Sequence, residues 1–192
     1  LEIIGDNAFQ GVYPFQELVL PHNVKCIGRS AFGDNPSLQR VVIPESTELI
    51  GPYAFSHCTA LSDIILPHKY IEISEDAFSD TACVNSQSPG AAYVGNHLCC
   101  YTPYTEDGTE PDCVIPEGIE YIDAGVFHFA PPMRIFFPKS LKGVDICAFI
   151  PNESDHELIT PDGIGEDYPV KNGRIAFQHD INDHWWDILN NE

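Results

Sequence analysis

The stretch SLQRVVIPESTELIGPYAF, residues 37–55, holds two markers that recur along the chain. One is an apolar residue followed by proline, here Ile43-Pro44, and the other is an Ala-Phe pair, here Ala54-Phe55. Five aromatic residues stand eleven positions after such a proline: Phe32, Phe55, Phe78, Phe127 and Phe149. The first four Ala-Phe pairs, ending at Phe9, Phe32, Phe55 and Phe78, follow one another every 23 residues. A fixed offset of this kind indicates an internal structural repeat.

The unit reads L-x-x-I-x-I-P-x-x-V-x-x-I-G-x-x-A-F-x-x-C/N-x-x and is too short to enclose a core of its own. Stacked units can share one core, because equivalent apolar side chains then lie over one another. The β-branched residues before each proline alternate with a period of two, which predicts a strand whose positions three and one before the proline face inward. Such strands should pair in parallel from coil to coil, and proline, which lacks an N–H, should end each strand. The Phe is expected to fill the far side of each coil.

These residues carry a family resemblance. The pattern resembles the BspA-type leucine-rich repeats of many surface proteins of gut and oral bacteria and some protists. It covers residues 1–80 and 114–150, with six Ala-Phe or Val-Phe markers in register, and it lacks the asparagine of the L-x-x-L-x-L-x-x-N repeats. The resemblance implies an α/β-type repeat fold: a right-handed leucine-rich repeat solenoid with short parallel strands, mostly β and irregular structure, and little helix. For function it implies adhesion or binding.

The spacing breaks between Phe78 and Pro116. Residues 92–101, AYVGNHLCCY, are apolar around Gly95-Asn96, which is typical of a hairpin turn. We interpret residues 79–113 as a degenerate repeat with a projecting hairpin, which is either a specific contact or a tolerated insertion. The repeat array then covers residues 1–150. Residues 151–192 are expected to form a degenerate last repeat and a C-terminal cap, because the open edge of a solenoid needs cover.

Composition narrows the class of partner. The 29 acidic and 9 basic residues give a formal net charge of −20, which disfavours nucleic acid and anionic membranes. No run approaches the roughly 18 apolar residues of a membrane span, so no membrane insertion is expected. The start at Leu1 shows no signal peptide and no initiator Met, so we expect a mature or excised piece of a longer protein.

The seven cysteines match no zinc-binding spacing. Cys26, Cys58 and Cys147 fall beside apolar repeat positions and are expected to be small buried hydrophobic residues. A disulfide stays open as an alternative for the four cysteines in or near the irregular segment: Cys83, Cys99, Cys100 and Cys113. The count does not decide the compartment.

Two polar stretches could hold a metal ion, but neither pattern favours one. In residues 179–184, HDINDH, a helix would place two mixed His/Asp pairs on separate faces, so a polar cap helix is favoured. The acidic residues around Asp107-Gly108 do not match the EF-hand spacing, which favours a solvated turn: Glu106, Asp107, Glu110 and Asp112. No G-x-S-x-G motif or phosphate-binding glycine loop is present. We predict no catalytic residue, no metal, no cofactor and no enzymatic activity.

The outward side of the predicted strands offers the candidate binding residues. Two positions before each proline stand Val19, Val42, Ile65, Val114 and Phe136. Four positions before it stand Glu17, Arg40, Asp63, Asp112 and Arg134. If the strands stack in register, an apolar row lies beside a mixed-charge row, and such surfaces often bind proteins. Arg134 and Phe136 are the strongest candidates because they are the largest groups. The alternative is β-propensity alone, since Val and Ile suit any strand position.

The leading hypothesis is a non-enzymatic protein-binding or adhesion module of a secreted or cell-surface bacterial protein. Its partner would be a protein, such as a host extracellular protein, and the module itself a monomer. Localisation in this hypothesis comes from the family resemblance. The alternatives are a structural spacer within a larger multidomain surface protein and a calcium-dependent module.

Overall fold

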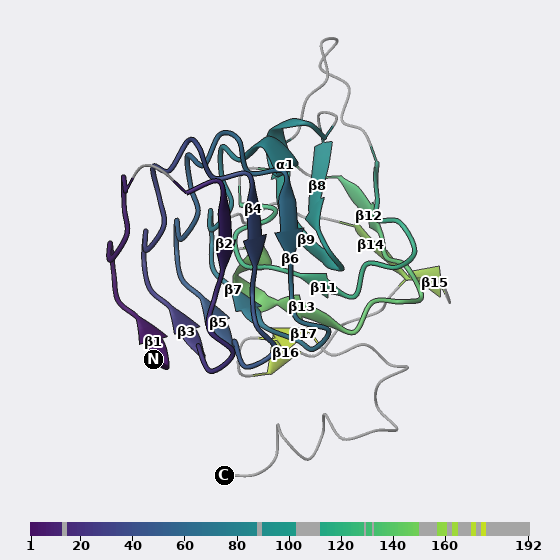
Figure 1. Cartoon of the computed structure of the whole chain (residues 1–192). Helices are drawn as coiled ribbons and strands as arrows, with labels where there is room; N and C mark the ends of the chain where they lie inside the picture. Colours follow the sequence, from purple (N-terminus) through teal and green to yellow (C-terminus); the bar gives the residue numbers. More distant parts are fainter. Residues whose placement is uncertain are drawn as a thin grey trace.

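The computed structural model describes residues 1–12, 15–87, 90–102, 112–128, 130–131 and 133–149, and the backbone of four strands at 157–160, 163–164, 170–171 and 174–175. Within these residues the chain winds into a stack of coils that begins at β1 (Figure 1). Each regular coil contributes one strand before the glycine of the unit and one before the proline. The predicted leucine-rich repeat solenoid with short parallel strands is confirmed.

Residues 1–80, the first stack, follow the repeat without interruption. The strands before the glycine position, which is Ser74 in the last of these coils, form one parallel sheet: β1 (Ile3–Ile4), β3 (Cys26–Ile27), β5 (Leu49–Ile50) and β7 (Glu72–Ile73). The strands before the prolines form a second: β2 (Glu17–Val19), β4 (Arg40–Val42) and β6 (Asp63–Ile65). Each strand ends two residues before its proline, as the missing N–H predicts.

Residues 90–149, the second stack, contain the degenerate repeat and two further coils. One sheet runs in the order β16 (Val170–Lys171), β17 (Arg174–Ile175), β13 (Gly143–Asp145), β11 (Tyr121–Ile122), β9 (His97–Thr102) and β8 (Gly90–Val94). The other runs β10 (Cys113–Val114), β12 (Arg134–Phe136), β14 (Glu157–Thr160) and β15 (Gly163–Ile164). Helix is limited to α1 (Ala82–Asn85) and a 3-10 turn, Ile146–Ala148, in the described ranges. None of the helices in these ranges is long and apolar enough to cross a membrane.

Stacked aromatic rings fill the first stack. Phe9, Phe32, Phe55 and Phe78 lie in a row with ring centroids 5.3, 5.3 and 5.5 Å apart and interplanar angles of 6°, 9° and 8°. The alanine before each of the last three rings is buried, at Ala31, Ala54 and Ala77, whereas Ala8 at the end of the stack is exposed. Phe therefore fills the far side of each coil, as the sequence predicted.

The C/N position of the unit, three residues after the ring, satisfies the carbonyl groups of the turn. The buried Asn35 amide donates to the carbonyls of Phe9 and Phe32 at 2.9 and 2.8 Å. Cys58 and Thr81 take the same position and donate to the Phe32 and Phe78 carbonyls. A small polar side chain suits this position because it replaces the water that the buried carbonyls lose.

The core divides into two clusters at the degenerate repeat. One joins the first stack to Val94, Cys83, Val84 and Cys99, and the other extends from Leu98 to Ala148. In the second cluster Tyr101 occupies the ring position, 5.5 Å from Phe127, and Phe127 stacks on Phe149 at 5.1 Å. The carboxylate of Glu75 reaches across the division to His128 Nδ1, 3.0 Å away.

Two expectations change. The hairpin at β8 and β9 exists, with its turn at Gly95-Asn96, but it does not project, because Ala92, Val94 and Leu98 are buried in the stack.

Of the three cysteines expected to be buried, Cys58 is buried, whereas Cys26 is half-buried and Cys147 is exposed. All seven cysteines are free thiols. The domain boundary at 150 stays a prediction. Of the expected last repeat and cap, residues 151–192, only the strands at 157–160, 163–164, 170–171 and 174–175 lie within the described residues.

Candidate protein-binding strand face

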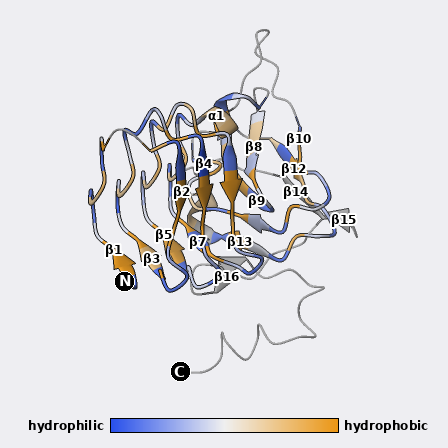
Figure 2. Ribbon diagram, viewed as in Figure 1, coloured by the Kyte–Doolittle hydropathy of each residue, from blue (hydrophilic) through white to orange (hydrophobic). Residues whose placement is uncertain are grey.

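Alternation along the strands before the prolines turns the predicted residues outward in the first stack. In β2, Glu17 is exposed and Val19 is 63% exposed, while Leu18 between them packs against the core. Arg40 and Val42 are half-buried in β4, around a fully buried Val41. Asp63 and Ile65 are exposed in β6. Figure 2 shows the result as strands β2, β4 and β6 that change from hydrophilic at their start to hydrophobic at their end.

The parallel register brings these residues together across three strands. Glu17, Arg40 and Asp63 are paired in one row, and Val19, Val42 and Ile65 in the next. Arg40 forms ion pairs with both neighbours, with Glu17 at 3.2 Å and with Asp63. The guanidinium is therefore fixed between two carboxylates. We call these six residues the first patch.

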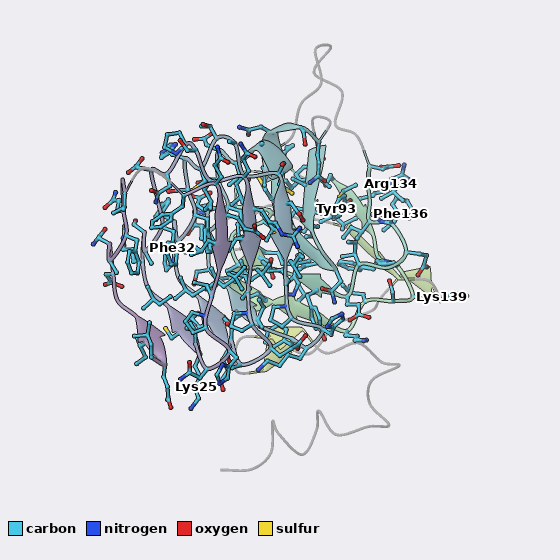
Figure 3. All side chains as sticks on the ribbon, viewed as in Figure 1. Lys25, Phe32, Tyr93, Arg134, Phe136 and Lys139 are labelled. Atoms are coloured by element: carbon cyan, nitrogen blue, oxygen red, sulfur yellow. The ribbon has the colours of Figure 1, made fainter. Side chains whose placement is uncertain are left out.

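The second stack repeats the arrangement on β10 and β12. Val114 is 66% exposed and is paired with the half-buried Phe136, while Asp112 and Arg134 are both exposed. Arg134 donates two hydrogen bonds to the Asp112 carboxylate, at 2.8 and 2.6 Å, and its guanidinium carbon lies 5.7 Å from the centre of the Phe136 ring. Figure 3 shows Arg134 and Phe136 together at the margin of the molecule. These four residues are the second patch.

The ten predicted residues do not form one continuous stripe. β2, β4 and β6 belong to one sheet and β10 and β12 to another, and β6 is not paired with β10. The physical reason is the degenerate repeat, whose residues 90–102 form the β8–β9 hairpin and add no strand to the sheet of β2, β4 and β6. The structure thus brings six of the predicted residues together in one place and four in another.

Sequence reasoning missed two positions of the second patch. The backbone register pairs Glu157 of β14 with Arg134, and Ile159 with Phe136. The signal was available, because Pro161 stands in the repeat and these residues precede it by four and two positions. In the backbone register these two positions continue the two rows of the second patch onto a third strand.

Sequence reasoning also missed a buried polar cluster beside β9. The Asp123 carboxylate lies 2.7 Å from His97 Nδ1 and accepts a hydrogen bond from the Cys99 thiol at 3.1 Å. His97 is fully buried, and its Nε2 has no partner within the described residues. Asp123 stands where the unit has glycine, as at Gly28 and Gly51, and this departure was the available signal.

Burial governs the protonation of this cluster. Burial raises the pKa of the Cys99 thiol well above its ordinary value, so the sulfur stays protonated and donates to the carboxylate. Burial also raises the pKa of Asp123, against the opposing effect of His97. The Cys99 thiol donates to one oxygen of the Asp123 carboxylate, and the other oxygen lies beside His97 Nδ1, so Asp123 links the two side chains. In the part of the chain that the structure describes, no group of three or more His, Cys, Asp or Glu side chains could hold a metal ion.

Most residues of the two metal-binding alternatives considered from the sequence lie outside the residues that the structure describes. Residues 179–184 and the acidic residues 106, 107 and 110 lie outside the described residues. Asp112, the remaining candidate for calcium, uses both carboxylate oxygens on Arg134.

Comparison with known proteins supports the repeat. Residues 1–97 match the sequence model of the BspA type leucine rich repeat region, in six copies. A solved structure, a leucine rich cell surface protein from Faecalibacterium prausnitzii A2-165, is similar at 20% identity with a TM-score of 0.36. That likeness covers 75% of this chain and 54% of the other protein, so the chain spans about half of that protein's length. No curated protein matches.

Proposed function

The chain belongs to the BspA-type leucine-rich repeat family, and we propose that it is a non-enzymatic protein-binding module of a secreted or cell-surface protein. The strands before the prolines supply the contact surface. One observation carries the proposal: three aliphatic side chains on these strands, Val19, Ile65 and Val114, are 63%, 38% and 66% exposed beside fixed ion pairs.

The rigidity of the face supports binding. Its backbone is held in parallel ladders, and Arg40 and Arg134 are each fixed by carboxylates of neighbouring strands. A partner would order few side chains on contact, so little entropy would be lost in forming the complex. Exposed apolar side chains on such a surface gain free energy when a partner removes them from water.

The test is a comparison of the wild-type chain with charge-introducing variants of the face. Val19→Asp and Val114→Asp should fold normally, because both side chains are largely exposed. In a pull-down with the immobilised chain, these variants should no longer bind the extracellular proteins that the wild-type chain binds. His22→Gln, an exposed change away from the two rows, is the matched control and should retain capture. Arg134→Ala with Phe136→Ala should also weaken binding. If every captured protein binds all variants equally, the proposal is wrong, and the structural spacer becomes the favoured function.

A further inference from the structure

The two patches have the same design. In the first patch the charged row reads Glu17, Arg40, Asp63, and in the second the register reads Asp112, Arg134, Glu157. Each row is thus an arginine flanked by two acidic positions. Beside each row lies a triplet of apolar residues: Val19, Val42 and Ile65 in the first patch, and Val114, Phe136 and Ile159 in the second.

The patches are separate surfaces of one chain. Each patch lies on its own sheet. The first spans the paired strands β2, β4 and β6, and the backbone register of the second runs across β10, β12 and β14. Figure 1 shows β8 between β6 and the sheet that holds β12 and β14. A partner segment that lies across three strands therefore meets a complete surface at either place without needing the other.

The chemistry of the patches indicates the kind of segment that fits. Each charged row has two carboxylate positions for one arginine, and the whole chain carries 29 acidic against 9 basic residues, so a basic partner is favoured. The Glu17 and Asp63 side chains remain 59% and 49% exposed while they hold Arg40, which leaves them accessible to a lysine or arginine. The apolar row of the first patch is wholly aliphatic and offers no ring face on which a sugar or base could stack. Polypeptide is the class that supplies both apolar and cationic side chains.

We propose that the chain is bivalent, and that the first and second patches each bind an extended polypeptide segment with apolar side chains next to lysine or arginine. This inference rests on the proposed function and adds the number of sites and the chemistry of the ligand. Two sites on one solenoid suit a partner with repeated segments, because binding at one site raises the effective concentration at the other.

The test uses a library of random linear 12-residue peptides selected on the immobilised full chain. Selected peptides should be enriched in lysine or arginine next to apolar residues, and their affinity should fall as salt rises. Titration calorimetry with one synthetic peptide should give two sites on the wild-type chain and on His22→Gln. It should give one site on Val19→Lys/Ile65→Lys, one on Val114→Lys, and none on the combined variant, because each lysine replaces an apolar contact and repels a basic peptide.

A tandem peptide provides a second measurement. Two copies of the selected sequence joined by flexible linkers of graded length should, at the best length, bind on the order of 100-fold more tightly than the single copy, with one tandem peptide per chain. Substitution in either patch should abolish that gain. A stoichiometry of one for the single peptide, sensitive to only one patch, would overturn bivalency and leave the proposed function standing. Peptides insensitive to every face variant, or no selected peptide at all, would overturn both.

Discussion

The first and second stacks build the same coil from different contacts. Residues 1–80 hold their coils together with a row of parallel Phe rings and with glycines that let backbones approach closely. Residues 90–149 replace the first ring with Tyr101, tilted by 46° from Phe127, and replace the glycine with Asp123. At the Asp123 coil the second stack therefore uses buried hydrogen bonds where the first stack uses a close backbone approach at Gly28 and Gly51. A repeat tolerates such exchange when each new side chain finds a partner in the neighbouring coil.

The largest expected effect concerns the ring row. Phe55 is fully buried between Phe32 and Phe78, so Phe55→Ala should lower the free energy of unfolding by about 3–5 kcal/mol. Phe9 is 38% exposed and has one stacked neighbour, so Phe9→Ala should cost clearly less. Urea unfolding followed by circular dichroism measures both. Equal losses would show that stacking does not govern the first stack.

The buried carboxylate of the second stack should come next. Asp123→Ala leaves His97 and Cys99 without their acceptor and should cost about 3 kcal/mol in the same urea experiment. Asn35→Ala, the matched change in the first stack, removes donors to several carbonyls and should cost about 1–2 kcal/mol. If Asp123→Ala unfolds like the wild-type chain, the second stack does not depend on its buried hydrogen bonds.

Close approach in the first stack predicts a third effect. A methyl group on Gly28 would lie 2.7 Å from the Asp6 nitrogen and 2.8 Å from the Gly5 carbonyl carbon, both backbone atoms that cannot move aside. Gly28→Ala should therefore cost about 2 kcal/mol. Ser74 takes the same position in the last coil of the first stack, so Ser74→Ala is the control and should be nearly neutral. Thermal melts compare the two, and equal shifts would argue against the close approach.

A smaller, pH-dependent difference is expected in the free energy of unfolding between the wild-type chain and Asp123→Asn. Burial raises the folded-state pKa of Asp123 above its ordinary value, so folding opposes ionisation of this carboxyl. The resulting loss of stability grows as pH rises from 3.8, the ordinary pKa of aspartate, through the higher folded-state pKa, and is constant above it. Compared with Asp123→Asn, the wild-type chain should therefore gain stability as pH falls from 7 toward 4. Urea midpoints across this range measure the difference, and a parallel pH dependence in both proteins would refute the assignment.

The smallest effects on stability should lie in the two patches. Arg40→Gln and Arg134→Gln break exposed ion pairs and should each cost below about 1 kcal/mol in urea unfolding. Raising the salt concentration should reduce even that cost, because exposed ion pairs are screened. A larger loss in either variant would mean that the patch stabilises the stack and is not free to serve a partner alone.

The sequence by itself determined the winding of the chain and the direction of its strand residues. The 23-residue offset predicted the stacked rings from Phe9 to Phe78, and the period of two predicted that Val19 and Glu17 face outward while Leu20 faces inward. These features depend on the local alternation of a strand and on the identity of neighbouring repeats. Both are properties that one coil shares with the next, so they can be read without knowing any distant contact.

Only the tertiary structure decided the division of the binding face and the buried cluster. The hairpin at residues 90–102 enters the stack and ends the row of strands at β6, and no offset in the degenerate repeat indicated this. His97, Cys99 and Asp123 meet because β9 and β11 are paired, and Glu75 reaches His128 across 53 positions. Where the repeat loses its spacing, side-chain partners are set by packing between distant segments, which local patterns do not encode.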